Sequence, residues 1–564
     1  MRALSLGLWP AAAAALVSGC GGDGGSASLP RLPAATPAPL AACTDLASRL
    51  NRPDTTIQRA EAVPAGTLTV AGQPVPAHCR VTGAMNSRVS AVDGNAYAIG
   101  FEMRLPEAWN GRFFHQVNGG LDGSVATAVG PVGGGGPLTN ALAQGFAVIS
   151  SDAGHAGSLG PNFGIDPQAR LDYGYQAVGS LTPMAKRLIE LAYGKQPDRS
   201  YLGGCSNGGR HAMVAASRHA DQYDGILAGN PGFRLPLAAI ANMAGVRVYG
   251  ALAHTAGDPS TGFTVAERTL VSNAVLARCD ALDGVADGLV QDTTACQARF
   301  DLQRDVPTCS GARDGSCLSA AQKTGIAGLF SGARSPAGTL IYSSFPYDAG
   351  LATSGWASWK YSNSVTRDPG AVGLVWQVPP EPVAGFDPLA FALTADLDGL
   401  LAKVNATNAT YAESAMSFMQ PPQADDLGTL RNRGAKMLVY HGTSDAIFSS
   451  DDTTAWYDAL NRRHGGEAAD FARFYRVPGM GHCSGGPATD QFDLLGPLVA
   501  WVEQGQAPGA VTASARGAGN AGGVNADLPA GWSAQRSRPL CPYPQVARYA
   551  GSGDVESAAS FRCE

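Results

Sequence analysis

The sequence predicts an α/β protein whose core is interrupted by a large inserted domain. Three short apolar runs, at residues 113–117, 146–150 and 436–440, have the length and composition of buried parallel strands. Between about residue 231 and residue 425 this pattern gives way to closely spaced cysteines, scattered Trp and Tyr, and irregular Gly and Pro. At 564 residues the chain is also too long for one small domain. We therefore expect a core in two parts with a lid domain between them.

The expected boundaries follow from these changes in pattern and from the composition near the N-terminus. Residues 21–40 are rich in Gly, Ser, Pro and Ala, which is typical of a flexible tether. The predicted organisation is a signal at 1–20, a tether at 21–42, the first part of the core at 43–230, the lid at 231–430 and the second part of the core at 431–564.

Other elements of the core are placed by residue spacing. Alternating polar and apolar residues at 67–70 and 97–104 predict strands of an antiparallel edge. Apolar residues at helical spacing predict a helix over 183–193. An Ala-rich helix over 210–218 is expected directly after the turn that contains Ser206.

The N-terminus has the pattern of a bacterial export signal. Arg2 provides a positive start, residues 3–17 form an Ala-rich apolar stretch, and residues 17–20 (Val-Ser-Gly-Cys) resemble a lipoprotein processing site. We expect Cys20 to carry a lipid and the protein to be an outer-membrane lipoprotein. An ordinary secretory signal with a chance cysteine is the alternative, and both place the protein outside the cytoplasm.

The charge and hydropathy of the remaining chain exclude some partners. The formal net charge is −6 and no basic run occurs, which argues against binding to nucleic acid. No apolar stretch of about 18 residues or more follows the N-terminus. Contact with a membrane is therefore expected only through the lipid at Cys20.

Cysteine count and spacing predict a disulfide framework. Of the 11 cysteines, removal of Cys20 leaves an even number in an oxidising compartment, which indicates about five disulfides. Spacing suggests the local pairs Cys43–Cys79, Cys279–Cys296, Cys309–Cys317 and Cys541–Cys563 and leaves Cys205 and Cys483. Cys205 precedes Ser206 and Cys483 follows His482, so the two sulfurs come together if Ser206 and His482 meet.

A candidate nucleophile lies in a Gly-x-Ser-x-Gly pentapeptide. Ser206 is its serine, between a predicted strand and a predicted helix. A strained turn of this kind exposes the serine oxygen, which needs a histidine base that is itself oriented by an acid. Asp445 follows the strand at 436–440, and His482 follows a later apolar run. The order Ser206, Asp445, His482 is that of α/β-hydrolases.

Several nearby residues compete with or accompany these three. Asp451 and Asp452 are alternative acids, but they lie farther beyond the strand. His211, on the expected helix after the nucleophile, and His155 are expected to be structural. His441 is expected either to line the pocket or to be structural.

An oxyanion formed at an ester carbonyl needs backbone N–H donors that already point at it. The amide of Asn207 is expected to supply one, because this residue directly follows the nucleophile. The Gly-rich turn at 118–120 is expected to supply the other from Gly119 or Gly120, with a plain tight turn as the alternative.

A second candidate site lies in the lid. Asp280, Asp283 and Asp287 occur close together in a Gly-containing loop between Cys279 and Cys296. Ca²⁺ prefers about six to eight oxygen ligands, which such a loop can supply, although the spacing is not that of an EF-hand. An ordinary solvated acidic turn is the alternative.

The chain resembles the tannase and feruloyl esterase family from about residue 43 to residue 563. The segments that carry the resemblance are Ser-Asp-Ala-Gly-His at 151–155, Gly-Gly-Cys-Ser-Asn-Gly-Gly-Arg at 203–210, His-Gly-Thr-Ser-Asp at 441–445, Pro-Gly-Met-Gly-His-Cys at 478–483 and Arg-Pro-Leu-Cys-Pro-Tyr-Pro at 538–544. The resemblance implies an α/β-hydrolase fold with a lid, and a disulfide between Cys205 and Cys483. It also implies a structural Ca²⁺ in the lid, held by Asp280, Asp283, Asp287 and the carbonyls of Val285 and Leu289.

The family resemblance further implies an aromatic acyl group, bound in a pocket between core and lid. Candidates for stacking on its ring are Trp356, Trp359, Tyr361, Trp376, Phe386, Phe391 and Phe418. A terephthalate-monoester hydrolase of this family binds its substrate's carboxylate with a lid arginine. Residues 368–430 here contain only one basic residue, Lys403, which favours phenolic substrates instead.

These observations predict a serine carboxylic-ester hydrolase that cleaves feruloyl, hydroxycinnamoyl or galloyl esters through an acyl-enzyme. The ester is expected to be a small molecule or to be attached to a plant polymer. A phthalate or terephthalate monoester hydrolase is the alternative. A non-catalytic, calcium-stabilised surface lipoprotein that binds carbohydrate or polyphenol is a third interpretation.

Overall fold

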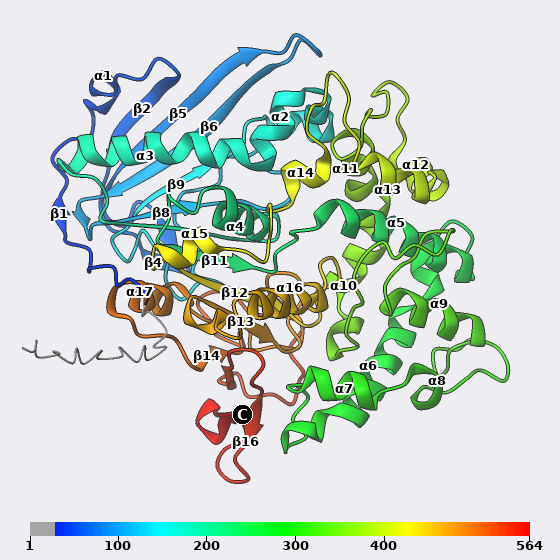
Figure 1. The fold of residues 1–564 in the computed structure, drawn as a ribbon. Helices are drawn as coiled ribbons and strands as arrows, with labels where there is room; N and C mark the ends of the chain where they lie inside the picture. The colour runs from blue at the N-terminus through cyan, green and yellow to red at the C-terminus, as the bar shows by residue number, and fades with distance from the viewer. Residues whose placement is uncertain (1–28) are drawn as a thin grey trace, which may run out of the picture.

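The computed structural model describes residues 29–564, so Cys20 and the predicted signal lie outside the described residues. Its centre is a nine-stranded sheet with the order β13-β12-β11-β10-β8-β9-β6-β5-β2 (Figure 1). Strands β13 to β9 run parallel, and β6, β5 and β2 continue the sheet in antiparallel fashion. The strands are β2 (Thr55–Val63), β5 (His78–Val89), β6 (Ala96–Pro106), β8 (Arg112–Gln116), β9 (Ala147–Ser151), β10 (Arg199–Cys205), β11 (Gly225–Gly229), β12 (Lys436–Gly442) and β13 (Ala472–Val477).

Helices cover both faces of the parallel part of the sheet. They are α3 (Ala177–Tyr193), α4 (Asn207–Arg218), α16 (Ser450–Arg463) and α17 (Leu495–Gln504). On β11, Ile226 packs in one hydrophobic cluster with residues of α3, α4 and α16, whereas Leu227 packs in another with Leu498 of α17. On β12, Val439 belongs to the first of these clusters and Leu438 to the second. The apolar runs seen in the sequence thus reflect strands that are buried on both sides.

The antiparallel edge differs from the one expected. Residues 97–104 fall in β6, but the stretch at 67–70 forms only the short strand β3 (Thr69–Val70), which pairs with β4 (Gln73–Pro74) outside the main sheet. The long edge strands β2 and β5 are not evident from the sequence, because β5 contains residues of low strand propensity such as Gly83. Pairing with two neighbours stabilises β5 where local propensity does not.

Helix α3 begins at Ala177, upstream of the predicted start at Pro183, which lies inside the helix. The added turn contains Gly179, a poor helix former, so local propensity does not indicate it. Burial of Val178 and Leu181 in the core stabilises this turn instead.

The described part of the predicted tether is docked on the core, so the expectation of flexibility is wrong for residues 36–42. The backbone N–H of Thr36 donates to Asp198 Oδ2 at 2.7 Å. The short strand β1 (Ala38–Pro39) pairs with β7 (Ala108–Trp109). Backbone hydrogen bonds, which a composition of Pro and Ala does not reveal, hold this segment in place.

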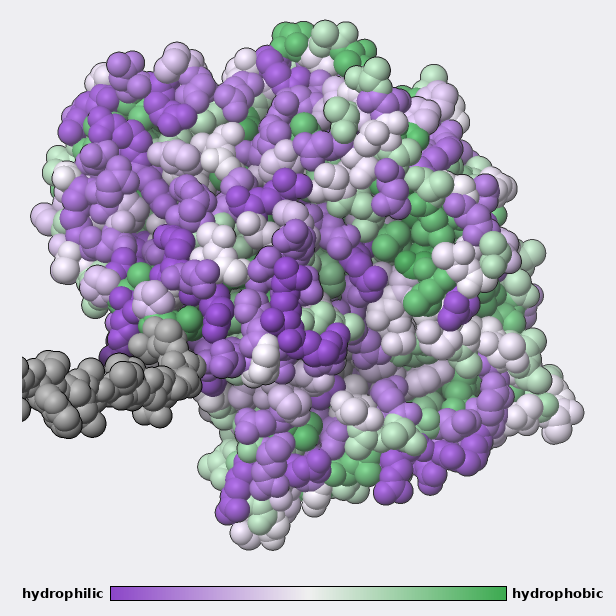
Figure 2. Space-filling view, in the orientation of Figure 1, coloured by the Kyte–Doolittle hydropathy of each residue, from purple (hydrophilic) through white to green (hydrophobic). Residues whose placement is uncertain are grey.

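The fully described segment between β11 and β12 adds no strand to the main sheet and forms a helical region. Its central helix, α5 (Leu235–Leu252), is long and apolar enough to span a membrane, so the expectation that no apolar stretch of this length follows the N-terminus is wrong, but 61% of that stretch is buried inside the protein. Figure 2 shows a hydrophobic area over this part of the surface. The other helices here are α6 (Val265–Cys279), α7 (Thr293–Arg299), α8 (Leu302–Asp305), α9 (Ala320–Phe330), α10 (Ser354–Ala357), α11 (Arg367–Leu374), α12 (Pro388–Thr394), α13 (Leu397–Lys403), α14 (Ala415–Met419) and α15 (Gly428–Asn432).

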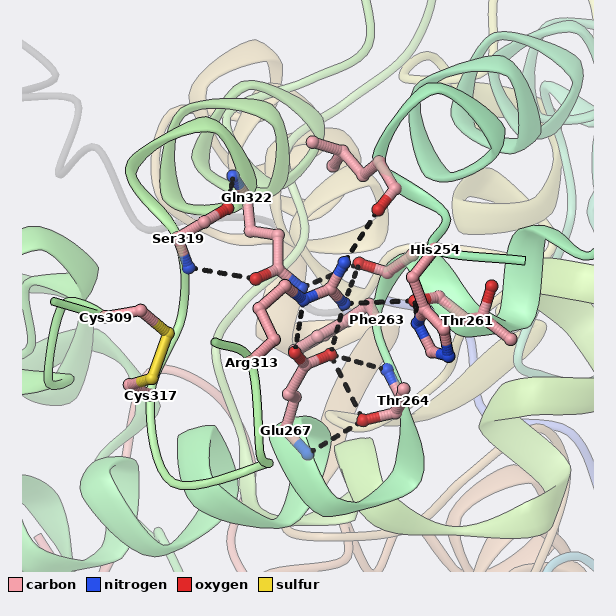
Figure 3. A network of polar contacts seen from close by, with 12 residues as sticks. His254, Thr261, Phe263, Thr264, Glu267, Cys309, Arg313, Cys317, Ser319 and Gln322 are labelled. Atoms are coloured by element: carbon pink, nitrogen blue, oxygen red, sulfur yellow. Dashed lines mark hydrogen bonds and ion pairs between the residues drawn. A yellow bond between two sulfur atoms is a disulfide. The ribbon is translucent and has the colours of Figure 1, made fainter. Parts of the chain in front are cut away.

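A partly buried arginine connects the helices of this region (Figure 3). Arg313 lies in the small loop closed by Cys309–Cys317 and makes two hydrogen bonds of 2.9 Å to the carboxylate of Glu267. Glu267 also caps the start of α6 together with Thr264. Because Arg313 donates in addition to the carbonyl of Leu252 at the end of α5, one side chain connects α5, α6 and the disulfide loop.

Five disulfides join the cysteines of the described chain in the pairs that the sequence suggested. They are Cys43–Cys79, Cys205–Cys483, Cys279–Cys296, Cys309–Cys317 and Cys541–Cys563. The Cys205–Cys483 bond spans 278 residues and connects the end of β10 with the loop after β13.

Candidate active site

Ser206 occupies a sharp turn between β10 and α4. Its backbone has φ 68° and ψ −125°, a conformation that typically costs a non-glycine residue about 1–3 kcal/mol. The flanking glycines make the turn possible: a Cβ on Gly204 would lie 2.2 Å from the carbonyl oxygen of Val117, and one on Gly208 would lie 2.5 Å from it. The Gly-x-Ser-x-Gly pattern therefore reflects close packing against the end of β8.

Ser206, His482 and Asp445 form one hydrogen-bonded line. Ser206 Oγ lies 2.8 Å from His482 Nε2, and His482 Nδ1 lies 2.8 Å from Asp445 Oδ2. The three residues follow β10, β13 and β12, so they meet at the carboxyl ends of the parallel strands. This is the arrangement in which a histidine can take the serine proton while the acid holds its ring in place.

Asp445 is held ionised and fixed in orientation. Its Oδ1 accepts the backbone N–H groups of Ile447 and Phe448 at 2.9 and 3.2 Å. Its Oδ2 accepts the side-chain amide of Asn230 at 2.7 Å in addition to His482. Burial alone would raise the pKa of Asp445, but the charge of His482 and hydrogen bonds from His441 and His482 outweigh it and hold this pKa well below the ordinary carboxyl value.

The competing acids are engaged elsewhere. Asp451 accepts a hydrogen bond of 2.7 Å from the hydroxyl of Ser344. Asp452 forms an ion pair with Arg234. His441 is buried in the core, where its Nδ1 lies 2.8 Å from the hydroxyl of Thr453.

The expected oxyanion donors surround the nucleophile. A side chain on Gly119 would begin 3.6 Å from Ser206 Cβ, so this turn lies directly beside the serine. Gly120 and Asn207 line the same pocket as Ser206. Asn207 is also the first residue of α4, where backbone N–H groups are free and the helix dipole favours negative charge.

A buried polar network, not predicted from the sequence, lies beneath this turn. Asp122 accepts the side-chain amide of Asn207 at 2.7 Å, and its Oδ2 lies 2.9 Å from His211 Nε2. Arg210 donates to Asn207 Oδ1 at 2.6 Å. Burial raises the pKa of Asp122 and lowers the pKa of His211. The network connects the turn at 118–122 to α4, which gives His211 a positional role.

His155 packs under the same turn. Its ring stacks on Phe163 with centroids 3.7 Å apart, and it is 2% exposed. Burial lowers its pKa to about 4, so the ring is neutral at ordinary pH. This environment is that of a packed structural histidine.

A small pocket with mainly apolar and aromatic walls opens beside Ser206. The ring of Trp359 stands edge-on to His482 with centroids 4.8 Å apart. Among the aromatic candidates, only Trp359 and Trp376 line the pocket; Tyr361, for example, is buried in the lid, where its hydroxyl donates to Phe263. The lining residues are Gly120, Leu121, Ser206, Asn207, Leu235, Ala239, Trp359, Arg367, Asp368, Trp376, Ile447 and Phe448.

Two charged residues of this pocket were missed by sequence reasoning. The guanidinium of the exposed Arg367 lies over the ring of Trp359, 4.8 Å from its centroid. Arg367 stands one residue before the window 368–430, in which only Lys403 is basic, so an arginine from outside that window lines the pocket. Asp368 is 5% exposed and lines the pocket beside it.

The carboxylates of the acidic lid loop differ in their partners. One oxygen of Asp283 is buried and has no hydrogen-bond partner among the described residues, and burial raises the pKa of Asp283 to about 7. Asp280, in contrast, accepts the backbone N–H groups of Asp287 and Gly288, and Asp287 forms an ion pair with Arg538. Within residues 29–564, no three His, Cys, Asp or Glu side chains stand close enough to hold a metal. The orphaned oxygen of Asp283 fits a cation, whereas Asp287 is shared with Arg538.

Comparisons with known proteins agree with this fold and site. Residues 79–564 match the family model described as tannase and feruloyl esterase. The chain is 40% identical over 535 residues to mono(2-hydroxyethyl) terephthalate hydrolase of Piscinibacter sakaiensis, with 88% of this chain and 86% of the relative covered. It is 28% identical over 553 residues to a probable feruloyl esterase B of Emericella nidulans, with 92% and 94% covered.

The fold is also that of a solved structure. The crystal structure of feruloyl esterase B from Aspergillus oryzae superposes with a TM-score of 0.72 at 24% identity, covering 92% of this chain and 98% of that one. Together with the family match over residues 79–564, these likenesses show that the chain is a member of the tannase and feruloyl esterase family, with an α/β-hydrolase fold.

Proposed function

We propose that this protein is an extracytoplasmic serine hydrolase that cleaves esters of aromatic acids, with feruloyl, hydroxycinnamoyl or galloyl groups on the acyl side. The observation that carries the proposal is the hydrogen-bonded line from Ser206 through His482 to Asp445 at the edge of a pocket with aromatic walls. Five disulfides support an oxidising compartment. Attachment through a lipid on Cys20 remains part of the proposal.

In the proposed mechanism, Ser206 Oγ attacks the ester carbonyl while its proton moves to His482 Nε2. The negative charge on the carbonyl oxygen is stabilised by the N–H of Asn207 and by one from Gly119 or Gly120, each donor contributing about 10²- to 10³-fold in rate. Asp445 stabilises the protonated ring of His482.

Collapse of this intermediate breaks the bond to the alcohol oxygen, which takes the proton from His482. Water then attacks the acyl-enzyme with His482 as base, and the acid leaves as Ser206 is restored.

The shape and polarity of the pocket favour an aromatic acyl group. Leu121, Leu235, Ile447 and Phe448 supply apolar walls, and Trp359 supplies a ring next to His482. A planar ring placed between such walls gains both burial and edge or stacking contacts.

A second candidate is a terephthalate monoester hydrolase, which Arg367 favours. This guanidinium at the pocket is positioned to pair with a carboxylate on the far side of a substrate ring. A relative that is 40% identical is named for hydrolysis of mono(2-hydroxyethyl) terephthalate.

We further propose a structural Ca²⁺ in the lid. Asp280, Asp283 and Asp287 would hold it with the carbonyls of Val285 and Leu289, and the orphaned oxygen of Asp283 supports this assignment. The ion would neutralise buried carboxylates and stabilise the loop between Cys279 and Cys296. No step of ester hydrolysis involves it.

The test is an assay of methyl ferulate, methyl gallate and mono(2-hydroxyethyl) terephthalate with the wild type and Ser206→Ala. We expect turnover of at least one ester to be lost in the variant. Absence of Ser206-dependent turnover of all three would leave the non-catalytic binding protein as the better interpretation. The rank order of the three kcat/KM values separates the phenolic from the carboxylate substrates.

A further inference from the structure

The inner wall of the acyl pocket carries a carboxylate whose hydrogen bonding is incomplete. Asp368 lies in the first turn of α11 and is 5% exposed. Its Oδ2 accepts the side-chain amide of Asn242 at 2.9 Å. None of the described residues donates a hydrogen bond to its Oδ1. This oxygen is not fully buried, and because Asp368 lines the pocket, it is open to a ligand that enters there.

The surroundings of Asp368 hold it in one orientation. Asn242 donates to it from α5, and the carbonyl oxygen of the same amide accepts from Lys360 Nζ at 3.2 Å. Burial raises the pKa of Asp368 to about 7, while Asn242, Arg367 and Lys360 oppose that rise. The side-chain amide of Asn242 therefore binds Oδ2 of Asp368, and Oδ1 is left available to the pocket.

A second polar group of the same pocket also lacks a partner. The indole N–H of Trp376 is buried without an acceptor among the described residues. Trp376 is 2% exposed and lines the pocket with Ser206 and Asp368. The pocket wall therefore presents an open carboxylate oxygen close to the apolar residues Leu121, Leu235 and Ile447, and a few placed polar groups among apolar residues are typical of a site that binds a specific ligand.

We propose that Asp368 selects acyl groups whose aromatic ring carries a hydroxyl, by accepting a hydrogen bond from that hydroxyl through Oδ1. The inference rests on the proposed function, because it concerns the acyl group of the ester cleaved at Ser206. A carboxylate on the substrate ring is disfavoured next to Asp368, because the two negative charges repel. Such a carboxylate would instead pair with Arg367 at the exposed side of the pocket.

The alternative is that Asp368 only fastens α11 to α5 through Asn242. Both roles predict that Asp368→Ala weakens the protein, so stability does not separate them. Discrimination between substrates does, because a purely structural residue affects hydroxylated and unsubstituted rings alike.

The experiment compares methyl 3,4-dihydroxycinnamate with methyl cinnamate, measuring kcat/KM for each. The second ester is smaller, so a steric clash cannot explain a preference for the first. We expect the wild type to prefer the dihydroxy ester by about 10- to 100-fold, the effect of one hydrogen bond to a charged group. In Asp368→Ala this preference should fall to near unity, while hydrolysis of methyl cinnamate continues.

Two further variants keep the result interpretable. Asp368→Asn preserves shape and can replace the alanine variant if that protein does not fold. In Asp368→Asn the ratio of the two kcat/KM values should fall to roughly the square root of the wild-type ratio, because a neutral hydrogen bond is about half as strong as one to a charged group. Leu121→Ala, which shortens an apolar wall of the same pocket, should change both kcat/KM values and leave their ratio unaltered.

The outcomes separate this inference from the proposed function. Ser206-dependent hydrolysis of both cinnamates with no preference in the wild type, or with a preference that survives in Asp368→Ala and Asp368→Asn, overturns the role of Asp368 alone. Hydrolysis of p-nitrophenyl acetate without hydrolysis of either cinnamate overturns the aromatic ester hydrolase and this inference with it.

Discussion

Asn230 and His482 bind the same oxygen of Asp445, at 2.7 and 2.8 Å. Asn230 directly follows β11 and has φ 37°, and its amide also lies 3.3 Å from the carbonyl of Gly481, the residue before His482. One side chain thus contacts both the acid and the loop that carries His482.

Removal of this side chain should impair alignment without removing a reacting group. We expect Asn230→Ala to lower kcat by about 10- to 100-fold with little change in KM, because a hydrogen bond to a charged group is lost. Steady-state kinetics on methyl ferulate will measure this, with the exposed Asn405→Ala as control. An unchanged kcat in folded Asn230→Ala would contradict the role.

The disulfide beside the site should support turnover as well as stability. Cys205→Ala with Cys483→Ala should lower kcat more than it raises KM, because the bond holds the serine turn against the histidine loop. The matched control is Cys541→Ala with Cys563→Ala, which removes a disulfide that does not adjoin these residues. Both pairs should lower Tm, and the chain-entropy model credits the long-range bond with roughly 5 kcal/mol. Equal kcat values in the two double variants would refute the prediction that the Cys205–Cys483 bond supports turnover.

Arg367 should affect only substrates that carry a carboxylate on the ring. Arg367→Ala should raise KM for mono(2-hydroxyethyl) terephthalate by roughly fivefold or more through loss of an ion pair, and leave methyl ferulate nearly unchanged. The exposed Arg187→Ala serves as the control for net charge. An equal effect on both esters would indicate that Arg367 shapes the pocket through Trp359 instead.

Removal of calcium should destabilise the lid. Dialysis against a chelator is expected to lower Tm by roughly 5 °C or more, and added Ca²⁺ should restore it. Asp283→Ala should abolish this dependence, whereas the exposed Asp221→Ala should retain it. A Tm that is indifferent to chelator and Ca²⁺ in the wild type would support the solvated acidic turn.

Arg313 should stabilise the lid independently of the site. Arg313→Ala leaves Glu267 buried without its partner, which typically costs about 3–5 kcal/mol. Thermal unfolding will measure this, with Arg334→Ala as control because Arg334 contacts only an exposed carbonyl. A loss of less than about 1 kcal/mol would show that water replaces Arg313.

The three residues of the candidate active site could be located from the sequence because each lies in a local pattern with a physical cause. Ser206 needs small neighbours on both sides, and Asp445 directly follows a strand that is buried on both faces. The disulfide pairs were equally accessible, since spacing and an even count left Cys205 and Cys483 together.

Residues that act through tertiary contacts could not be located in this way. Asn230 and Asp122 reach the site only because β11 and the turn after β8 lie next to the serine, and neither carries a recognisable motif. Arg367 and Asp368 belong to the short helix α11. Its position depends on how it packs against α5. The antiparallel strands β2 and β5 likewise depend on pairing with neighbouring strands and not on the strand propensity of their residues.

The docked N-terminal segment and the candidate active site lie at opposite ends of the parallel strands. Pro30 packs against Gly434 and Arg31 against Gly505, so the described chain starts near the amino end of β12. Ser206, Asp445 and His482 stand at the opposite, carboxyl ends of the parallel strands. If the N-terminus carries the lipid proposed above, the side of the core that bears Pro30 faces the membrane, and Ser206 and His482 face away from it, where a bulky ester can approach.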